Sequence, residues 1–322
     1  MTYQFSVCSG LLGEQNTRFI PYQPFRSLEE KFELASRIKG LDGLELGYPE
    51  NFADLKKLKE LLARYELGVS SVNLKVRGPD FMQHGSFTSP EKIAVESATA
   101  WGKEAMDAVV EVGGSVVTTC PLNDGFDYPF EMEYTSAWEK MIDGIRQVAE
   151  HRDDVNLAIE YKLSDPRTRS LVSNVGEALF LAQKTGRKNV GITLDFGHAL
   201  IARENPSQAA SMAAMEKRLF LVHMNDNDRV SDIDLITGSV HFWETLEFFY
   251  YLPKLNYQGW LVTDVFPKSL DPAQVFSTTI DMQKRYIERA KFIDSLGIRE
   301  QLLERDLMGV FEKLLPVVSV QD

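Results

Sequence analysis

Four side chains that can bind a metal ion or exchange a proton recur at intervals in the second half of the chain. They are Glu160, Asp195, His223 and Asp264, and each comes at the end of a short apolar run. The intervals of 35, 28 and 41 residues match one strand-and-helix repeat each. Three carboxylates and one imidazole that met without a cation would repel one another. With a divalent ion they form an oxygen-rich ligand set with one nitrogen, which favours Mn²⁺, Mg²⁺ or Co²⁺ over thiophilic zinc.

A second group of similar residues overlaps the first. His198 follows Asp195 by three positions, and Asp232 and Asp234 follow His223 by nine and eleven. An Asp-x-Asp pair presents two carboxylates on one edge of a loop, which is enough to hold a second hard cation. Alone, this acidic loop would be interpreted as a solvated turn. Beside His198 and a shared Asp195, it predicts a two-metal site that can bind two oxygens of one substrate.

Lys162 is a cation close to these acidic groups. It lies two positions after Glu160, so on a strand both side chains point to the same face. An exposed lysine is usually only solvated, but this placement favours a catalytic role.

The elements that must position these residues follow from the hydrophobic pattern. Eight short runs rich in Val, Ile, Leu, Thr and Phe are nearly continuous in apolar residues, as strands buried on both faces are. Helical patterns alternate with them, and eight such units predict a TIM barrel, whose active sites lie at the carboxyl ends of the strands. The turn at 8–13 lacks the Gly-x-Gly-x-x-Gly spacing of a doubly wound dinucleotide-binding fold. The predicted strands are 3–9, 43–48, 68–76, 115–121, 156–162, 190–196, 219–225 and 259–266.

The chain is expected to form one domain. No linker rich in Pro, Gly or Ser divides it, so we predict a barrel over 1–296 and a C-terminal helical extension over 297–322, with one amphipathic helix at 298–317. Extensions of this kind often cover the barrel or a neighbouring subunit. We therefore expect a homo-oligomer, a dimer or a tetramer.

Charge and composition exclude several classes of partner. The 322 residues include 35 Lys and Arg against 47 Asp and Glu, a net charge of −12. Phosphate backbones and anionic membranes repel such a chain, so we expect no nucleic acid and no membrane as partners. The two cysteines, Cys8 and Cys120, lie in apolar runs and are expected to be buried thiols. The first residues show no targeting pattern, so we expect a cytoplasmic protein.

The combined motif resembles a known family. Glu160-x-Lys162, Asp195-x-x-His198, His223, Asp232-x-Asp234 and Asp264 are similar to the motifs of the xylose isomerase-like TIM barrels, particularly the two-metal aldose–ketose isomerases such as rhamnose isomerase and xylose isomerase. The resemblance covers roughly residues 155–270, and the rest of the chain only as a barrel pattern. It implies one or two ions per subunit (Mn²⁺, alternatively Co²⁺ or Mg²⁺). A structural ion would be held by Glu160, Asp195, His223 and Asp264, and a catalytic one by Asp195, His198, Asp232 and Asp234.

The resemblance also implies a reaction, hydrogen transfer between C1 and C2 of a small unphosphorylated sugar such as rhamnose, an aldopentose or apiose. Lys162 would hydrogen-bond a substrate oxygen near the reacting carbons. His84 could take the place of the ring-opening histidine of xylose isomerase, which the run 43–48 lacks, and Trp138 could stack on a sugar face. The expected catalytic residues are Lys162, Glu160, His198 and Asp264, and the expected substrate contacts are Lys162, His198, His84 and Trp138. No second catalytic glutamate is expected to face Glu160.

Other functions of the same barrel remain as alternatives. A ketose 3-epimerase of the tagatose 3-epimerase type uses one metal and two glutamates, whereas strand eight here ends in Asp264, and an epimerase has no use for Asp232-x-Asp234. An endonuclease is disfavoured by the net charge and by the lack of a basic stripe. A non-catalytic sugar-binding barrel would not need to retain every metal-ligand residue. The sequence does not identify the sugar, whose recognition we expect in loops 9–26, 77–90 and 121–137.

Overall fold

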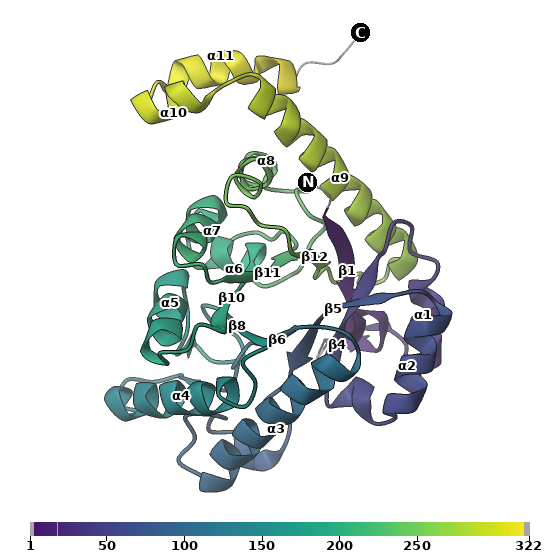
Figure 1. Cartoon of the computed structure of the whole chain (residues 1–322), viewed down its shortest axis with the longest axis vertical. Helices are drawn as coiled ribbons and strands as arrows, with labels where there is room; N and C mark the ends of the chain where they lie inside the picture. Colours follow the sequence, from purple (N-terminus) through teal and green to yellow (C-terminus); the bar gives the residue numbers. More distant parts are fainter. Residues whose placement is uncertain (1–2, 18, 319–322) are drawn as a thin grey trace.

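The computed structural model describes residues 3–17 and 19–318, which form a closed barrel of eight parallel strands inside a layer of helices (Figure 1). The barrel closes because β1 pairs with both β4 and β12. This confirms the predicted (β/α)8 TIM barrel. In order around the barrel, the strands are β1 (Gln4–Cys8), β4 (Gly43–Tyr48), β5 (Gly68–Leu74), β6 (Val116–Thr119), β8 (Asn156–Glu160), β10 (Val190–Asp195), β11 (Leu219–Met224) and β12 (Trp260–Thr263).

The helices cover the barrel because each carries an apolar face, and the buried side chains of both layers form one main hydrophobic core. The first helix begins at a capping box, in which the Ser27 hydroxyl accepts from the Glu30 amide and the Glu30 carboxylate accepts from the Ser27 amide. The helices of the barrel layer are α1 (Leu28–Ala35), α2 (Leu55–Arg64), α3 (Lys92–Glu111), α4 (Tyr134–Ala149), α5 (Val175–Lys184), α6 (Phe196–Ile201), α7 (Pro206–Met215), α8 (Phe242–Tyr251) and α9 (Pro272–Ser295).

Several short elements in the loops that follow the strands were not predicted. Two small antiparallel pairs lie there, β2 (Gln15–Asn16) with β3 (Pro21–Gln23) and β7 (Gly125–Phe126) with β9 (Arg169–Ser170). Three single-turn 3₁₀ helices follow β1, β4 and β5 at Ser9–Leu12, Glu50–Phe52 and Asp80–Met82. Helix α6 begins directly after β10, so the chain turns sharply at the end of that strand.

The C-terminal segment extends away from the barrel at the end of α9 (Figure 1). The prediction of one helix over 298–317 was wrong, because the chain forms α10 (Arg299–Glu304) and α11 (Leu307–Val318). Arg305 adopts the left-handed conformation with a φ of 58°, which ends α10, and the Asp306 carboxylate accepts a hydrogen bond from the Gly309 amide at the start of α11. Within the described residues, no helix combines the length and the apolar character that a membrane crossing requires.

Candidate metal centre and its basic neighbour

The strand register brings the four predicted ligand residues together at one end of the barrel. Glu160 and Asp195 are the last residues of β8 and β10, His223 lies opposite Asp195 on β11, and Asp264 directly follows β12. Their ligand atoms all lie within 4.8 Å of one another. Glu160, Asp195 and His223 are buried, whereas the Asp264 side chain is 25% exposed. Asp264 is therefore the most exposed member of a group of three carboxylates and an imidazole.

His223 presents one ring nitrogen to this group. Its Nδ1 lies 3.3 Å from an Asp264 oxygen, 3.7 Å from Glu160 and 3.9 Å from Asp195. Nevertheless, this buried nitrogen has no hydrogen-bond partner in the described part of the chain. A buried nitrogen without a partner is costly, and a metal ion among the carboxylates would satisfy it. The donor set therefore fits a divalent cation.

The opposite nitrogen of His223 is held by a residue that sequence reasoning missed. Glu45 on β4 lies inside the barrel, and its Oε2 is 3.0 Å from His223 Nε2. The same carboxylate accepts hydrogen bonds from Ser71 (2.6 Å), Asn73 (2.9 Å) and the Cys8 thiol (3.4 Å). Burial raises the pKa of Glu45, but the charge of His223 and the hydrogen bonds from His223, Ser71 and Asn73 outweigh burial and lower the pKa to about 2. Glu45 thus fixes the orientation of the ring. A glutamate inside the apolar run 43–48 was the signal that could have found it.

Two carboxylates of the site, Asp195 and Asp234, are poorly accommodated as anions. Burial and the charge of Glu160 raise the pKa of Asp195 to about 6, although His198 opposes this shift. Burial and the charges of Asp232 and Asp264 raise the pKa of Asp234 well above its usual value. For Glu160, the charge of His223 outweighs burial and lowers the pKa. Negative charge is therefore in excess here, as expected of a cation site.

The basic neighbour of this group is Lys162, held by Asp232. The Lys162 ammonium lies 2.7 Å from Asp232 Oδ2 and 3.2 Å from Asp165 Oδ2. Burial alone would lower the pKa of Lys162, but the charge of Asp232 raises the pKa above its usual value, so the ammonium group stays charged. The other oxygen of Asp232 is buried and has no hydrogen-bond partner among the described residues. The structure thus pairs a fixed cation with a free carboxylate oxygen.

His198 lies between Asp232, the partner of Lys162, and Glu160 of the four-residue ligand group. Its Nε2 lies 3.3 Å from Asp232 Oδ2, and its Nδ1 lies 3.3 Å from Glu160 Oε1. The backbone explains this position, because Asp195 caps helix α6 by accepting a hydrogen bond from the His198 amide at 2.8 Å. Burial lowers the pKa of His198, but the charges of Asp195 and Asp232 outweigh burial and raise the pKa to about 10.

Asp234 joins the site through Asn225, a second residue that sequence reasoning missed. The Asn225 amide group donates to Asp234 Oδ1 at 3.0 Å and to both oxygens of Asp195 at 3.1 and 3.2 Å. Its carbonyl oxygen accepts from the Gly197 amide at 2.7 Å. Asn225 directly follows β11, so its place at a strand end was the available signal. The predicted second ligand set is therefore adjacent to the first, and its metal-binding role stays a prediction.

The structure does not place the two remaining predicted substrate contacts with this cluster. The Trp138 ring packs edge-on against Phe180, with the ring centroids 5.3 Å apart, and joins helices α4 and α5. His84 is exposed and lines a separate cavity of about 310 Å³ together with Lys140 and Arg167. Trp138 is far from its predicted role as a sugar contact because an aromatic residue on a barrel helix gains most from packing against the neighbouring helix.

Comparison with known proteins agrees with this architecture. A protein from Rhizobium meliloti named a probable sugar isomerase is 27% identical over 254 residues, which are 74% of this chain and 58% of that protein. The chain thus spans 58% of the length of the curated relatives it matches. Among solved structures, an L-ribulose 3-epimerase superposes with a TM-score of 0.72 at 19% identity, covering 92% of this chain and 98% of that one. D-allulose 3-epimerase from Methylomonas sp., solved with D-allulose, gives 0.68 at 18% identity, covering 88% and 97%.

The family assignment rests on a match along most of the chain. A family model described as xylose isomerase-like TIM barrel matches residues 32–286, which include every member of the two acidic groups. The chain belongs to the xylose isomerase-like TIM barrel family.

Proposed function

We propose that the protein is a metal-dependent sugar isomerase that transfers hydrogen between C1 and C2 of a small aldose. The observation that carries this proposal is the contact of Lys162 with Asp232, 2.7 Å, beside the four-residue ligand group. A fixed ammonium group is suited to a substrate oxygen on which negative charge develops during hydrogen transfer. The names of the curated relatives, probable sugar isomerases, support the same reaction.

In this proposal Glu160, Asp195, His223 and Asp264 hold one divalent ion, Mn²⁺, Co²⁺ or Mg²⁺. Their support is the mutual approach of the ligand atoms and the unpartnered nitrogen of His223. When bound, such an ion polarises the oxygens of a substrate. The second ion, at Asp195, His198, Asp232 and Asp234, stays a prediction.

The chain's own residues supply the remaining chemistry. Lys162 donates a hydrogen bond to the substrate oxygen next to the reacting carbon, and Asp232 keeps it charged and in place. The free oxygen of Asp232 accepts a hydrogen bond from a substrate hydroxyl. His198, held between Glu160 and Asp232, contacts a substrate oxygen and limits the poses that the sugar can take.

A ketose 3-epimerase is the second candidate. The observation in its favour is the fold, because two ketose 3-epimerase structures superpose on this chain over 97–98% of their length. Epimerisation needs a proton to leave one face of the sugar and to return on the other. Glu45, the further buried glutamate of the site, is a poor choice for this second role because four donors surround its carboxylate.

The decisive experiment follows deuterium from C2 of an aldose. A panel of aldoses is first assayed with Mn²⁺ for ketose formation, and the best substrate is then prepared with deuterium at C2. Mass spectrometry of the product should find deuterium at C1, since hydrogen moves between adjacent carbons. Complete loss of deuterium to water would indicate an ene-diol intermediate and a separate base. Exchange at C3 of a ketose, with no aldose turned over, would replace the isomerase by the epimerase.

A further inference from the structure

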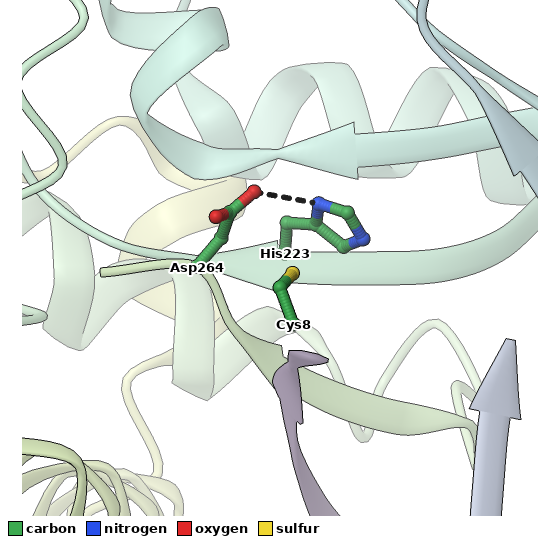
Figure 2. A group of neighbouring side chains, drawn as sticks. All are labelled: Cys8, His223 and Asp264. Atoms are coloured by element: carbon green, nitrogen blue, oxygen red, sulfur yellow. Dashed lines mark ion pairs between the residues drawn. The ribbon is translucent and has the colours of Figure 1, made fainter. Parts of the chain in front are cut away.

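The barrel places a thiol next to the candidate metal centre. Cys8 is the last residue of β1, and the register pairs Val7 with Thr263, so Cys8 and Asp264 come next on neighbouring strands. On its other side Cys8 lies opposite Glu45 of β4. Figure 2 shows the sulfur of Cys8 near the imidazole of His223, and an Asp264 oxygen joined by a dashed line to the near ring nitrogen.

These three residues form a ligand group of their own. One ligand atom each from Cys8, His223 and Asp264 lies within 4.8 Å of the other two. The nitrogen that the oxygen-rich site uses, Nδ1 of the fully buried His223, has no hydrogen-bond partner in the residues described, so it is available to an ion at either ligand group. Figure 2 shows this nitrogen facing Asp264. A sulfur, a nitrogen and an oxygen are the mixed donor set that zinc and cadmium accept.

We propose that Cys8, His223 and Asp264 form a second metal site, specific for thiophilic divalent ions, which overlaps the oxygen-rich site. The two sites share His223 and Asp264, so one occupant excludes the other. A hard ion such as Mn²⁺ or Mg²⁺ selects Glu160 and Asp195 as its further ligands, because it prefers oxygen to sulfur. A thiophilic ion selects Cys8 and moves away from these two carboxylates. The centre therefore discriminates between metals by position.

Binding at the second site has a defined proton balance. The thiol of Cys8 loses its proton, the sulfur lone pair forms the bond to the ion, and the proton leaves to the solvent. The hydrogen bond from Cys8 to Glu45 is given up in this step, while Ser71, Asn73 and His223 continue to surround that carboxylate. No oxidant or reductant takes part. An ion at this site is an inhibitor of the proposed isomerase, because the oxygen-rich site loses two of its four ligands.

The test is a Cd²⁺ titration of the metal-free full-length protein, followed by ultraviolet absorption. Sulfur-to-cadmium charge transfer should appear with one equivalent of Cd²⁺ in the wild type and in Cys120→Ser, the matched control. Cys120 is the other cysteine and belongs to neither ligand group in the described chain. The band should be lost in Cys8→Ser. The wild type should also release one proton more per Cd²⁺ than Cys8→Ser, as measured in weakly buffered solution with a pH indicator.

A second measurement separates a lost ligand from a damaged fold. Mn²⁺ affinity, measured by electron paramagnetic resonance, should be the same in Cys8→Ser, Cys8→Ala and the wild type, because Mn²⁺ uses the oxygen-rich site. If either variant keeps wild-type Mn²⁺ binding and still shows the charge-transfer band, the proposal is overturned. It is also overturned if the wild type shows no band, or if the band depends on Cys120. All of these readouts report metal binding, so the result is independent of whether the protein isomerises sugars.

Discussion

At the scale of single residues, Lys162 is the side chain whose replacement tests the proposed chemistry most directly. Lys162→Met keeps most of the length and removes the charge beside Asp232. We expect kcat to fall by about 10²-fold or more, the usual loss when one preorganised charge stabiliser is removed. Metal content, measured by elemental analysis, should not change because Lys162 is no ligand. Lys59→Met, which removes a surface ion pair with Glu111, is the control and should be fully active. Equal activity of the two variants would remove Lys162 from the mechanism.

Glu45 offers a second test at this scale. In Glu45→Gln the side chain keeps its shape but loses the negative charge that orients His223. Loss of such support usually weakens metal binding by about 10- to 100-fold, and we expect this loss for Mn²⁺ in calorimetric titrations. Nitrogen NMR of the imidazole should show that the preferred tautomer of His223 changes. Glu111→Gln on the surface serves as the control. Unchanged affinity and tautomer would mean that Glu45 only fills the barrel.

The sequence predicted which residues come together where they stand at the ends of strands. Glu160, Asp195 and Asp264 stand at the ends of apolar runs, so the topology alone brings them together. Glu45 was missed because its partner His223 is 178 positions away. No local spacing encodes a hydrogen bond across the barrel. The polar network depends on the closed fold, and only the structure reveals it.

At the scale of elements, the loop after β11 carries the second acidic pair. Asp232→Asn together with Asp234→Asn removes two charges from this loop while the strands and the first ligand group stay intact. We expect one bound ion by elemental analysis and a chain that still folds, but no turnover, because Lys162 and His198 lose the partner that positions them. Asp228→Asn, a change at an exposed residue of the same loop, is the control. Near-normal turnover of the double variant would favour the epimerase.

The strands could be predicted from the sequence because their hydrophobic pattern matches their burial on both faces of the barrel wall. All eight strands lie within two or three residues of the predicted ranges because a strand buried on both faces is apolar throughout. Gly68 shows the limit of local signals. A glycine just after a helix often ends it, but here Glu66 takes the left-handed conformation after α2 with a φ of 53°. Gly68 is instead the first residue of β5, where an added Cβ would come within 3.1 Å of the Trp260 ring. This close packing arises from a strand distant in the sequence.

At the scale of the whole molecule, metal binding should stabilise the fold. At an ion concentration 100 times the dissociation constant, the gain is about 2.7 kcal/mol, which raises Tm by about 4 °C in a chain of this length. The gain should be smaller at pH 5 than at pH 7.5. The pKa of Asp195 is raised to about 6 in the metal-free protein, so below that pH a proton competes with the ion. Calorimetric melting with Mn²⁺ and after chelation, at both pH values, measures the difference. An equal shift at both values would exclude Asp195 as a ligand.

The C-terminal helices bear on the quaternary structure. Leu303, Leu307 and Met308 are exposed on α10 and α11, next to a groove of about 270 Å³ between these helices and α8. Exposed apolar surface of this kind indicates a protein contact, so the homo-oligomer stays our prediction. Leu307→Lys with Met308→Lys should shift the mass in light scattering to that of one chain. Met215→Lys, at an exposed apolar residue of α7, should not. A wild type that is already monomeric would refute the prediction.

The pairing of the first strand with the last has a consequence for the order of events during synthesis. Cys8 leaves the ribosome early and Asp264 late, yet the two are neighbours once β1 and β12 pair. A nascent chain that stops before β12 therefore lacks a ligand of both proposed metal sites and has an open barrel. The chain therefore binds metal at either proposed site only after β12 has closed the barrel. A partial chain lacks a complete ligand group.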